Sequence, residues 1–375
     1  IKPSMEPQSR CFALFLLLRG TECSDSPFAR AYRTSRWLVR GIGSELLTNV
    51  GGRGGRDWRR VYRPGSRRFP ADGGDGALAV VTGATGGIGA EVAEALASCG
   101  YSVVVAARHC ERGEALARRL RASGASAEFI ALRMDNIGSI RRFAAALHRR
   151  PCALLVNNAG VMGVSRSETM ATNLIGPTLL TLSLLPALRQ HSSPRVVNVG
   201  SSSHLRAGSV HSSTLHDNAL DSDLCAYAES KLGLMQLSTL LRAALPWLTV
   251  TDAHPGLVWT PMLQQFWGGF TPALRASGIA RIAFKSPACA ATTVTAAALD
   301  PRQPPARWGE HSRWARGWQH GPYFVNRRPN GFQSSESRQM DLALGLWTTV
   351  LEPMAVDVFP VTTREVSKGL SWVRF

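Results

Sequence analysis

The sequence is poor in lysine and has no closely paired cysteines. Four of its 43 basic side chains are lysines, so the formal charge of +17 comes almost entirely from arginine. Such a ratio is more typical of a coding bias than of a surface selected for polyanions, and no specific nucleic-acid partner is expected. The seven cysteines include no Cys-x-x-Cys pair, which argues against a disulfide framework or a zinc site.

The spacing of the histidines and the length of the apolar runs bear on two further features, a metal site and a membrane-spanning segment. The nine histidines include no His-x-x-x-His pair, so no metal site is predicted. The strongest apolar run of residues 1–76 covers eight residues, 11–18, whereas crossing a bilayer takes roughly twenty. With Lys2 and Arg10 before it, this run suits a short signal region or the remnant of an anchor.

Residues 1–76 differ in composition from the rest of the chain. They carry 14 basic and 7 acidic side chains, a net charge of +7, and residues 51–76 are rich in Gly, Arg and Pro without apolar periodicity. This composition is typical of a linker or a disordered segment. We therefore expect a basic N-terminal extension ahead of the folded domain.

From residue 77 the chain alternates short apolar runs with helical patterns. Strands are expected over 77–82, 102–107, 128–134, 153–157, 195–199, 248–254 and 323–325, and helices over 87–99, 111–122, 137–149, 178–189, 224–244 and 286–299. This alternation predicts an α/β fold, a Rossmann-like doubly wound parallel sheet flanked by helices, in a single domain over 77–330. Residues 303–320 are expected to form an irregular insertion, and 331–375 a C-terminal helix and tail whose last twenty residues show no clear pattern.

A glycine-rich turn follows the first expected strand. Thr82 and Gly83 are followed by Gly87, Ile88 and Gly89, where a helix is expected to begin. Glycines in this setting let the backbone turn sharply and approach a pyrophosphate, and the helix N-terminus favours its negative charge. The turn therefore predicts a dinucleotide-binding site.

The end of the second expected strand indicates which dinucleotide is bound. NAD enzymes place an acid there for the ribose hydroxyls, whereas NADP enzymes offer a base to the 2′-phosphate. Here the strand runs into Arg108, with no acid before Glu111, and a guanidinium can pair with phosphate through two hydrogen bonds. NADP(H) is therefore favoured over NAD(H). The alternative is an ordinary surface arginine in an arginine-rich chain.

Tyr227 and Lys231 stand four residues apart in an expected helix, which places them on one helix face. A phenol with a pKa of about 10 is a poor acid or base near neutrality until an adjacent ammonium favours the phenolate. Because tyrosine and lysine are both scarce in this chain, the pairing is more informative than usual. It indicates a general acid/base.

Taken together, these motifs resemble the short-chain dehydrogenase/reductase family, in particular its retinol-dehydrogenase-like and X-linked dehydrogenase/reductase-like branch. The resemblance covers roughly residues 77–300 and includes, in the family's order, the further segments Asn157-Asn158-Ala159-Gly160, Thr172-Asn173, 195–201 and 254–260. It implies an enzyme that moves a hydride between NADP(H) and a carbonyl or alcohol.

The resemblance also implies the roles of the reacting residues. Tyr227 would be the general acid for carbonyl reduction or the base for alcohol oxidation, and Lys231 would lower its pKa and hold the nicotinamide ribose. Ser201 would bond the reacting oxygen, and Asn173 would anchor a water in the proton relay. Without the other motifs, Ser201 would be interpreted as a strand-end serine and Asn173 as a helix cap.

Further cofactor contacts are implied by the same resemblance. Asp135, Asn157 and Gly160 would border the adenosine half. Thr260 would bond the carboxamide, beside Pro255 and Gly256. The predicted function is therefore an NADP(H)-dependent oxidoreductase acting on a small lipophilic carbonyl or alcohol, such as a retinoid, another isoprenoid or a steroid. Apolar candidates for the substrate wall, equally well explained as a buried helix and loop, are Leu257, Trp259, Met262, Phe266 and Trp267.

One departure from the family keeps alternatives open. Thirteen positions separate Gly160 from Asn173, fewer than is common in this branch, and the missing stretch begins a helix that frames the cleft. A second hypothesis is therefore a non-catalytic NADP-binding protein whose function is interaction. A third is a nucleic-acid or membrane-surface binder acting through the arginine-rich N-terminus. The sequence also leaves open a homodimer, association with a membrane surface, and a location on the endoplasmic reticulum or in the cytoplasm.

Overall fold

The computed structural model describes residues 76–207, 210, 223–260, 262, 284–300, 323–325, 327 and 333–371. The basic extension up to residue 75, the insertion at 303–320, and Phe266 and Trp267 lie outside the described residues. The described strands form one parallel sheet of seven in the order β3-β2-β1-β4-β5-β6-β7. Their bounds are β1 Leu78–Thr82, β2 Ser102–Ala107, β3 Ala127–Ala131, β4 Cys152–Asn157, β5 Arg195–Val199, β6 Thr249–His254 and β7 Tyr323–Val325.

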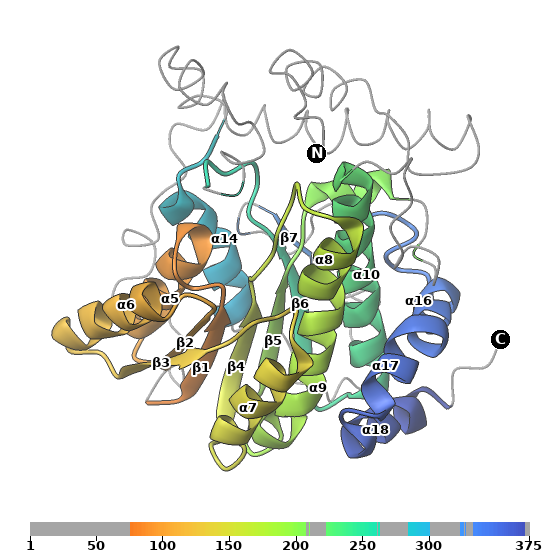
Figure 1. Ribbon diagram of the computed structural model, residues 1–375, viewed down its shortest axis with the longest axis horizontal. Coiled ribbons are helices and arrows are strands. Elements are labelled where there is room, and N and C mark those ends of the chain that lie inside the picture. The colour runs from red at the N-terminus through yellow and green to blue at the C-terminus, as the bar shows by residue number, and fades with distance from the viewer. Residues whose placement is uncertain are drawn as a thin grey trace, which may run out of the picture.

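Helices cover both faces of this sheet (Figure 1). On one face lie α5 Gly87–Ser98, α6 Cys110–Ala122 and α14 Pro287–Leu299. On the other lie α7 Ile137–Leu147, α8 Arg166–Met170, the π-helical turn η2 Ala171–Ile175, α9 Gly176–Leu188 and α10 Asp223–Ala244. The expected α/β fold, doubly wound about a parallel sheet, is therefore confirmed.

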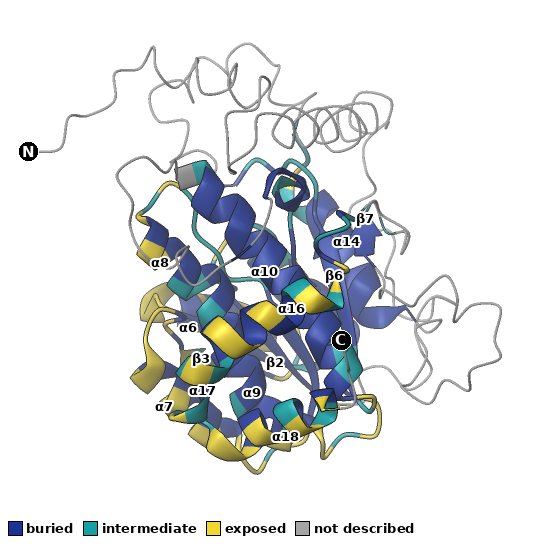
Figure 2. Cartoon of the chain, turned by 90° about the vertical axis from the view of Figure 1, so that its right-hand side faces the viewer, coloured by how far each residue is buried: buried dark blue, intermediate teal, exposed yellow. Residues whose placement is uncertain are grey.

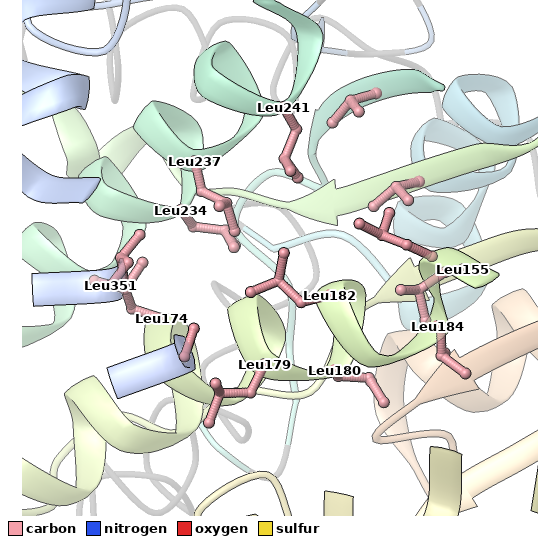
Figure 3. Close-up of a cluster of buried hydrophobic side chains, with 14 of the residues drawn as sticks. Leu155, Leu174, Leu179, Leu180, Leu182, Leu184, Leu234, Leu237, Leu241 and Leu351 are labelled. Atoms are coloured by element: carbon pink, nitrogen blue, oxygen red, sulfur yellow. The ribbon is translucent and has the colours of Figure 1, made fainter. Parts of the chain in front are cut away.

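Side-chain alternation along the central strands divides the interior into two cores. In β1, Val80 packs into the core on the α9 and α10 side, whereas Val81 packs into the core on the α5 and α14 side. Successive side chains of a strand point to opposite faces, so a strand covered on both sides has to be apolar throughout. The larger core is rich in leucine: Figure 3 shows side chains from β4, α9 and α10 meeting Leu351 of the C-terminal segment.

Most element bounds agree with expectation to within two residues, and two differ by more for identifiable reasons. The third strand ends at Ala131 instead of residue 134, because its partner β2 ends at Ala107, opposite Ala131. The helix expected from residue 178 begins at Arg166 instead, as one helical run through α8, η2 and α9. By contrast, the expected start of α14 is confirmed: the Ser286 hydroxyl accepts a hydrogen bond from the Cys289 amide at 3.1 Å.

The same run, Arg166–Leu188, is the one helix among the described residues that is long and apolar enough to cross a membrane. In its most apolar window, 72% of the residues are buried inside the protein. Nearly every residue of α9 is buried, and its leucines belong to the larger core. Packing within the domain therefore accounts for the apolarity of this helix.

The C-terminal segment folds back onto the sheet domain. It forms α16 Met340–Leu346, the π-helical turn η6 Trp347–Leu351, α17 Glu352–Val356 and α18 Pro360–Leu370. These elements pack on α10 and α9 and add Trp347, Val350 and Val366 to the larger core. Figure 2 shows that the outer sides of α16 and α18 are exposed. The sequence analysis did not predict α18. Its inner face becomes evident only against α9 and α10.

We expect Trp347→Ala to lower the free energy of unfolding by about 3–5 kcal/mol, because it opens a large cavity in the core. Trp347 is 1% exposed, and its indole Nε1 donates to Ser367 Oγ at 3.1 Å. The matched control is Val361→Ala in α18, a side chain that is 78% exposed, with an expected change within about 0.5 kcal/mol. Urea unfolding followed by circular dichroism measures both. Equal unfolding midpoints for the two variants would show that the C-terminal helices do not share the core.

Candidate active site

A cleft lies at the carboxyl ends of β1, β2, β3 and β4. At this edge the chain order reverses, since β2 and β3 lie on one side of β1 and β4 lies on the other. Such a reversal leaves a crevice in which open α/β sheets bind their ligands. The crevice has a volume of about 370 Å³. Its walls come from the glycine turn, the ends of β2 and β3, the loop after β4, the start of the Arg166–Leu188 helical run, and Thr260 and Met262.

The glycine turn forms a tight cradle at the base of this cleft. Gly83 has φ +64°, and a β-carbon there would lie 2.9 Å from the Ala159 Cα. A β-carbon on Gly89 would overlap the Asn158 side chain and the Gly83 carbonyl. Among the described residues no side chain caps the first turn of α5, so its backbone amides are available to an anion. This cradle fits the pyrophosphate of a dinucleotide.

Thr82 and Asn158 connect the glycine turn to the loop after β4. The Thr82 hydroxyl donates to the Val156 carbonyl at 3.2 Å and accepts from the Asn158 and Ala159 amides, each at 3.0 Å. The Asn158 side chain donates to the Thr82 carbonyl at 2.8 Å. Thr82 is fully buried, so its side chain fixes the shape of the cleft.

The two asparagines of this loop point in different directions. Asn158 lines the cleft. Asn157 is buried beneath it, where its Nδ2 donates to Asn198 Oδ1 at 2.8 Å and to Thr181 Oγ1 at 3.1 Å. Asn157, which was predicted to border the adenosine half, is therefore not among the residues that line the cleft, whereas its neighbour Asn158 is.

Arginines gather where β2 and β3 end. Arg108 and Arg112 both line the cleft, one directly after β2 and the other in the first turn of α6. Opposite them, Arg133 pairs with the Asp135 carboxylate through Nη2 at 2.8 Å and Nε at 3.2 Å. The hydrogen bond from Arg133 holds the pKa of Asp135 below its usual value, and the charge of Arg108 adds a smaller effect. Asp135 is therefore a carboxylate that pairs with Arg133 and lies within the electrostatic influence of Arg108.

Tyr227 and Lys231 lie on the buried side of α10, next to the end of β5. Ser201, the second residue after β5, lies close enough to the Tyr227 hydroxyl to lower its pKa, and the Ser201 hydroxyl also donates to Ser203 Oγ at 3.1 Å. The Lys231 ammonium lies 5.7 Å from the centre of the Tyr227 ring and donates to the Val199 carbonyl at 2.8 Å. The structure thus brings together the predicted serine, tyrosine and lysine.

Burial sets the pKa values of these groups. Loss of solvent raises the pKa of Tyr227 to about 12, against a smaller lowering by the Ser201 hydrogen bond. Burial lowers the pKa of Lys231 to about 8. Near pH 7 the phenol is therefore protonated and able to donate, and the lysine is still mostly charged. The lowering of the tyrosine pKa by Lys231 that the sequence predicted is not seen in this structure, where burial raises that pKa and Ser201 provides the lowering effect.

Asn173 lies in the wide π-helical turn η2, close to the lysine. Its Oδ1 accepts from the Val161 amide at 2.8 Å, and its Nδ2 donates to the Val161 carbonyl at 2.9 Å and to Ser230 Oγ at 3.1 Å. A β-carbon on Gly160 would lie 3.3 Å from Asn173 Oδ1 and 3.6 Å from Lys231 Nζ. Asn173 therefore joins the cleft wall to α10 through its side chain. Single π-helical turns within helices are common at functional sites.

The short connection between Gly160 and Asn173 closes without breaking this arrangement. Ser165 caps α8 by accepting from the Glu168 amide at 3.2 Å. Arg166 then forms an ion pair with Glu229 of α10 at 2.5 Å, with the two side chains 5% and 9% exposed. The shortened segment is thus attached to the helix that carries Tyr227 by a buried ion pair.

The residues after β6 complete the surroundings. Thr260 lines the cleft, and its amide donates to the Val258 carbonyl at 2.9 Å. Pro255 and Gly256, which were also predicted to contact the cofactor, are not among the residues that line the cleft; they lie beside Lys285, whose ammonium is 3.5 Å from the Pro255 carbonyl. Sequence analysis did not single out Lys285, Asn158 or Arg112. The one available signal for the second arginine was its place close after Arg108, at the start of the expected helix 111–122.

Sequence comparison agrees with this geometry. The profile of the family described as short chain dehydrogenase matches residues 77–268. This chain belongs to the short-chain dehydrogenase/reductase family and is an oxidoreductase of CH–OH groups with an NAD(P)-binding fold.

Individual relatives lie in the retinol-dehydrogenase-like branch. Polyprenol dehydrogenase of Mus musculus is 39% identical over 245 residues, which are 60% of this chain and 72% of that protein. Retinol dehydrogenase 11 of Homo sapiens is 33% identical over 202 residues, 50% of this chain and 63% of that protein. Among solved structures, the Pseudomonas aeruginosa RhlG/NADP active-site complex matches with a TM-score of 0.50 and 27% identity, over 60% of this chain and 90% of that one.

We expect Arg166→Met to destabilise the protein by about 3–5 kcal/mol, because the buried Glu229 carboxylate loses its ion pair with Arg166. Glu229→Met should cost a similar amount. The double variant should lose clearly less than the sum of the two, since neither charge then remains. Urea unfolding of the three variants and wild type gives the coupling energy. Additive losses would show that the pair does not attach α8 to α10.

Proposed function

We propose that this chain is an NADP(H)-dependent oxidoreductase that interconverts an alcohol and a carbonyl on a lipophilic substrate, with Tyr227 as general acid/base. The observation that carries the proposal is the buried contact among Tyr227, Ser201 and Lys231 beside a glycine-lined cleft. A buried, hydrogen-bonded titratable group with a shifted pKa at a crevice is what acid–base chemistry needs.

In carbonyl reduction, Tyr227 donates its proton to the carbonyl oxygen while Ser201 hydrogen-bonds the same oxygen. When bound, the nicotinamide supplies the hydride. A tyrosine pKa of about 12 keeps the phenol protonated near neutrality, which suits this direction. For alcohol oxidation Tyr227 has to accept the proton. Lys231, still largely charged at pH 7, and the bond from Ser201 stabilise the phenolate that this direction requires.

The arginines at the end of β2 support NADP(H) as the cofactor. Arg108 and Arg112 reach the same part of the cleft, and two guanidinium groups provide a stronger site for a 2′-phosphate than the single base expected from the sequence. Asp135 and Gly160 line the adjoining wall and are proposed to contact the adenosine half. Thr260 is proposed for the carboxamide, with Pro255 and Gly256 shaping its loop.

A lipophilic substrate is supported by the relatives and by the loop after β6. The names of two relatives specify a polyprenol and a retinol dehydrogenase. Trp259 precedes Thr260 directly and meets Phe284 edge to face, with 5.2 Å between ring centres. Met262 adds an apolar side chain to the cleft lining. Membrane-surface association, a homodimer and the cellular location remain predictions.

Tyr227→Phe should lower carbonyl reduction by at least about 100-fold, because it removes the proton donor while keeping the ring. NADPH binding should stay close to wild type. The matched control is Tyr101→Phe. Tyr101 is also 9% exposed, but it packs in the core on the α5 and α14 side of the sheet, so turnover should be unchanged. NADPH oxidation with a panel of retinoid, isoprenoid and steroid carbonyls measures this.

The result also separates the two leading hypotheses. Near-wild-type turnover in Tyr227→Phe would contradict its assigned role. NADPH binding without turnover of the panel by wild type would instead favour the non-catalytic binding protein.

A further inference from the structure

A buried histidine, His204, holds the turn that carries Ser201. Ser201 stands at the start of the short 3₁₀ helix η3, Ser202–Arg206, which follows β5 directly. His204 lies within this helix and is fully buried, and it belongs to none of the motifs from which the function was predicted. Its ring is close enough to Ser201 to control where that residue's main chain lies.

The two ring nitrogens of His204 contact two separate segments of the chain. Nδ1 lies 2.6 Å from the Ser201 carbonyl, and Nε2 accepts a hydrogen bond from the Ser334 amide at 3.2 Å. A carbonyl can only accept and an amide N–H can only donate. The ring is therefore neutral, with its proton on Nδ1.

The loop that contains Ser334 is hydrogen-bonded to α10, the helix that carries Tyr227. Ser334 belongs to the loop before α16. In this loop the main-chain carbonyl of Glu336 accepts from Gln236 Nε2 at 3.2 Å, and that of Ser337 accepts from Thr239 Oγ1 at 3.0 Å. Gln236 and Thr239 both lie on α10, the helix of Tyr227 and Lys231. His204 thus links the Ser201 turn to α10 by a route separate from the Ser201–Tyr227 hydrogen bond.

Aromatic packing limits the movement of the same turn. The His204 ring meets the Tyr323 ring edge to face, with 5.5 Å between centres, and Tyr323 stacks on His254 at 6.3 Å. A β-carbon on Gly200, the residue before Ser201, would lie 3.5 Å from the Tyr323 ring. The turn is therefore enclosed by rings on one side and fixed by a hydrogen bond on the other.

We propose that His204 is a positioning residue for the reaction: by holding the Ser201 carbonyl through Nδ1, it fixes the Ser201 hydroxyl relative to the Tyr227 hydroxyl. The inference rests on the proposed function of that site. His204 itself touches none of the reacting atoms. A displacement of about 1 Å in a group that aligns the reacting oxygen can lower the rate about 100-fold, which sets the size of the expected effect.

Two replacements separate the contacts of the ring. In His204→Asn the side-chain amide takes the place of Nδ1, so the hydrogen bond to Ser201 is kept and that to Ser334 is lost. In His204→Gln the amide takes the place of Nε2, so the reverse holds. The proposal predicts that the Gln variant loses about 10- to 100-fold in kcat and the Asn variant less than about 3-fold. NADPH affinity should be unchanged in both. The exposed His148→Gln serves as control.

Equal losses in the two variants, or a loss that follows thermal stability, would overturn the proposal and leave His204 a structural residue. A second measurement needs no variant and no turnover. Nitrogen-15 NMR of histidine-labelled wild type should show His204, assigned through its contact with the Tyr323 ring, protonated at Nδ1 alone. A ring protonated at Nε2 and not at Nδ1 would exclude the bond to Ser201. Absence of wild-type turnover, by contrast, would count against the proposed function and leave this NMR result to decide the contact.

Discussion

The burial of helix α10 is the constraint on which the site depends. One side of the helix packs on the sheet, and the elements α8, η3, α16 and α18 cover it elsewhere. Water is therefore excluded from Tyr227 and Lys231, which raises the pKa of the phenol and lowers that of the ammonium. Both shifts disfavour the charged forms, so the neighbouring polar groups determine what the pair can do.

Contacts with other protein groups replace the hydrogen bonds to water that the polar side chains of α10 lose on burial. Ser201 bonds the phenol, the Val199 carbonyl accepts from the ammonium, and Asn173 reaches Ser230 on the same helix. The ion pair between Arg166 and Glu229 attaches the shortened segment to this helix as well. Each of these contacts satisfies buried polar groups whose desolvation would otherwise be costly, so together they hold the site in one geometry.

The features that sequence predicted are those that local patterns specify. Strand periodicity located β1, β2, β5 and β7, and the strand-to-helix setting of the glycines identified the cleft. What sequence did not show depends on distant partners. Nothing in the local sequence distinguishes Arg166 from other arginines, because its role depends on the ion pair with Glu229. The role of His204 likewise depends on a hydrogen bond with Ser334, 130 positions later. The end of β3 was misplaced because a strand needs a partner, and the α18 helix was missed because its buried face is defined by contacts with α9 and α10.

The short connection between Gly160 and Asn173 still leaves a cleft, and we propose that this cleft is selective for NADP(H). The direct test is titration of the full-length protein with NADPH and with NADH, following nicotinamide emission and tryptophan fluorescence. We expect NADPH to bind tightly and NADH weakly, with the difference removed in Arg108→Ala/Arg112→Ala because the 2′-phosphate then has no guanidinium partner there. Binding of neither nucleotide, or equal binding of both by wild type, would contradict the account.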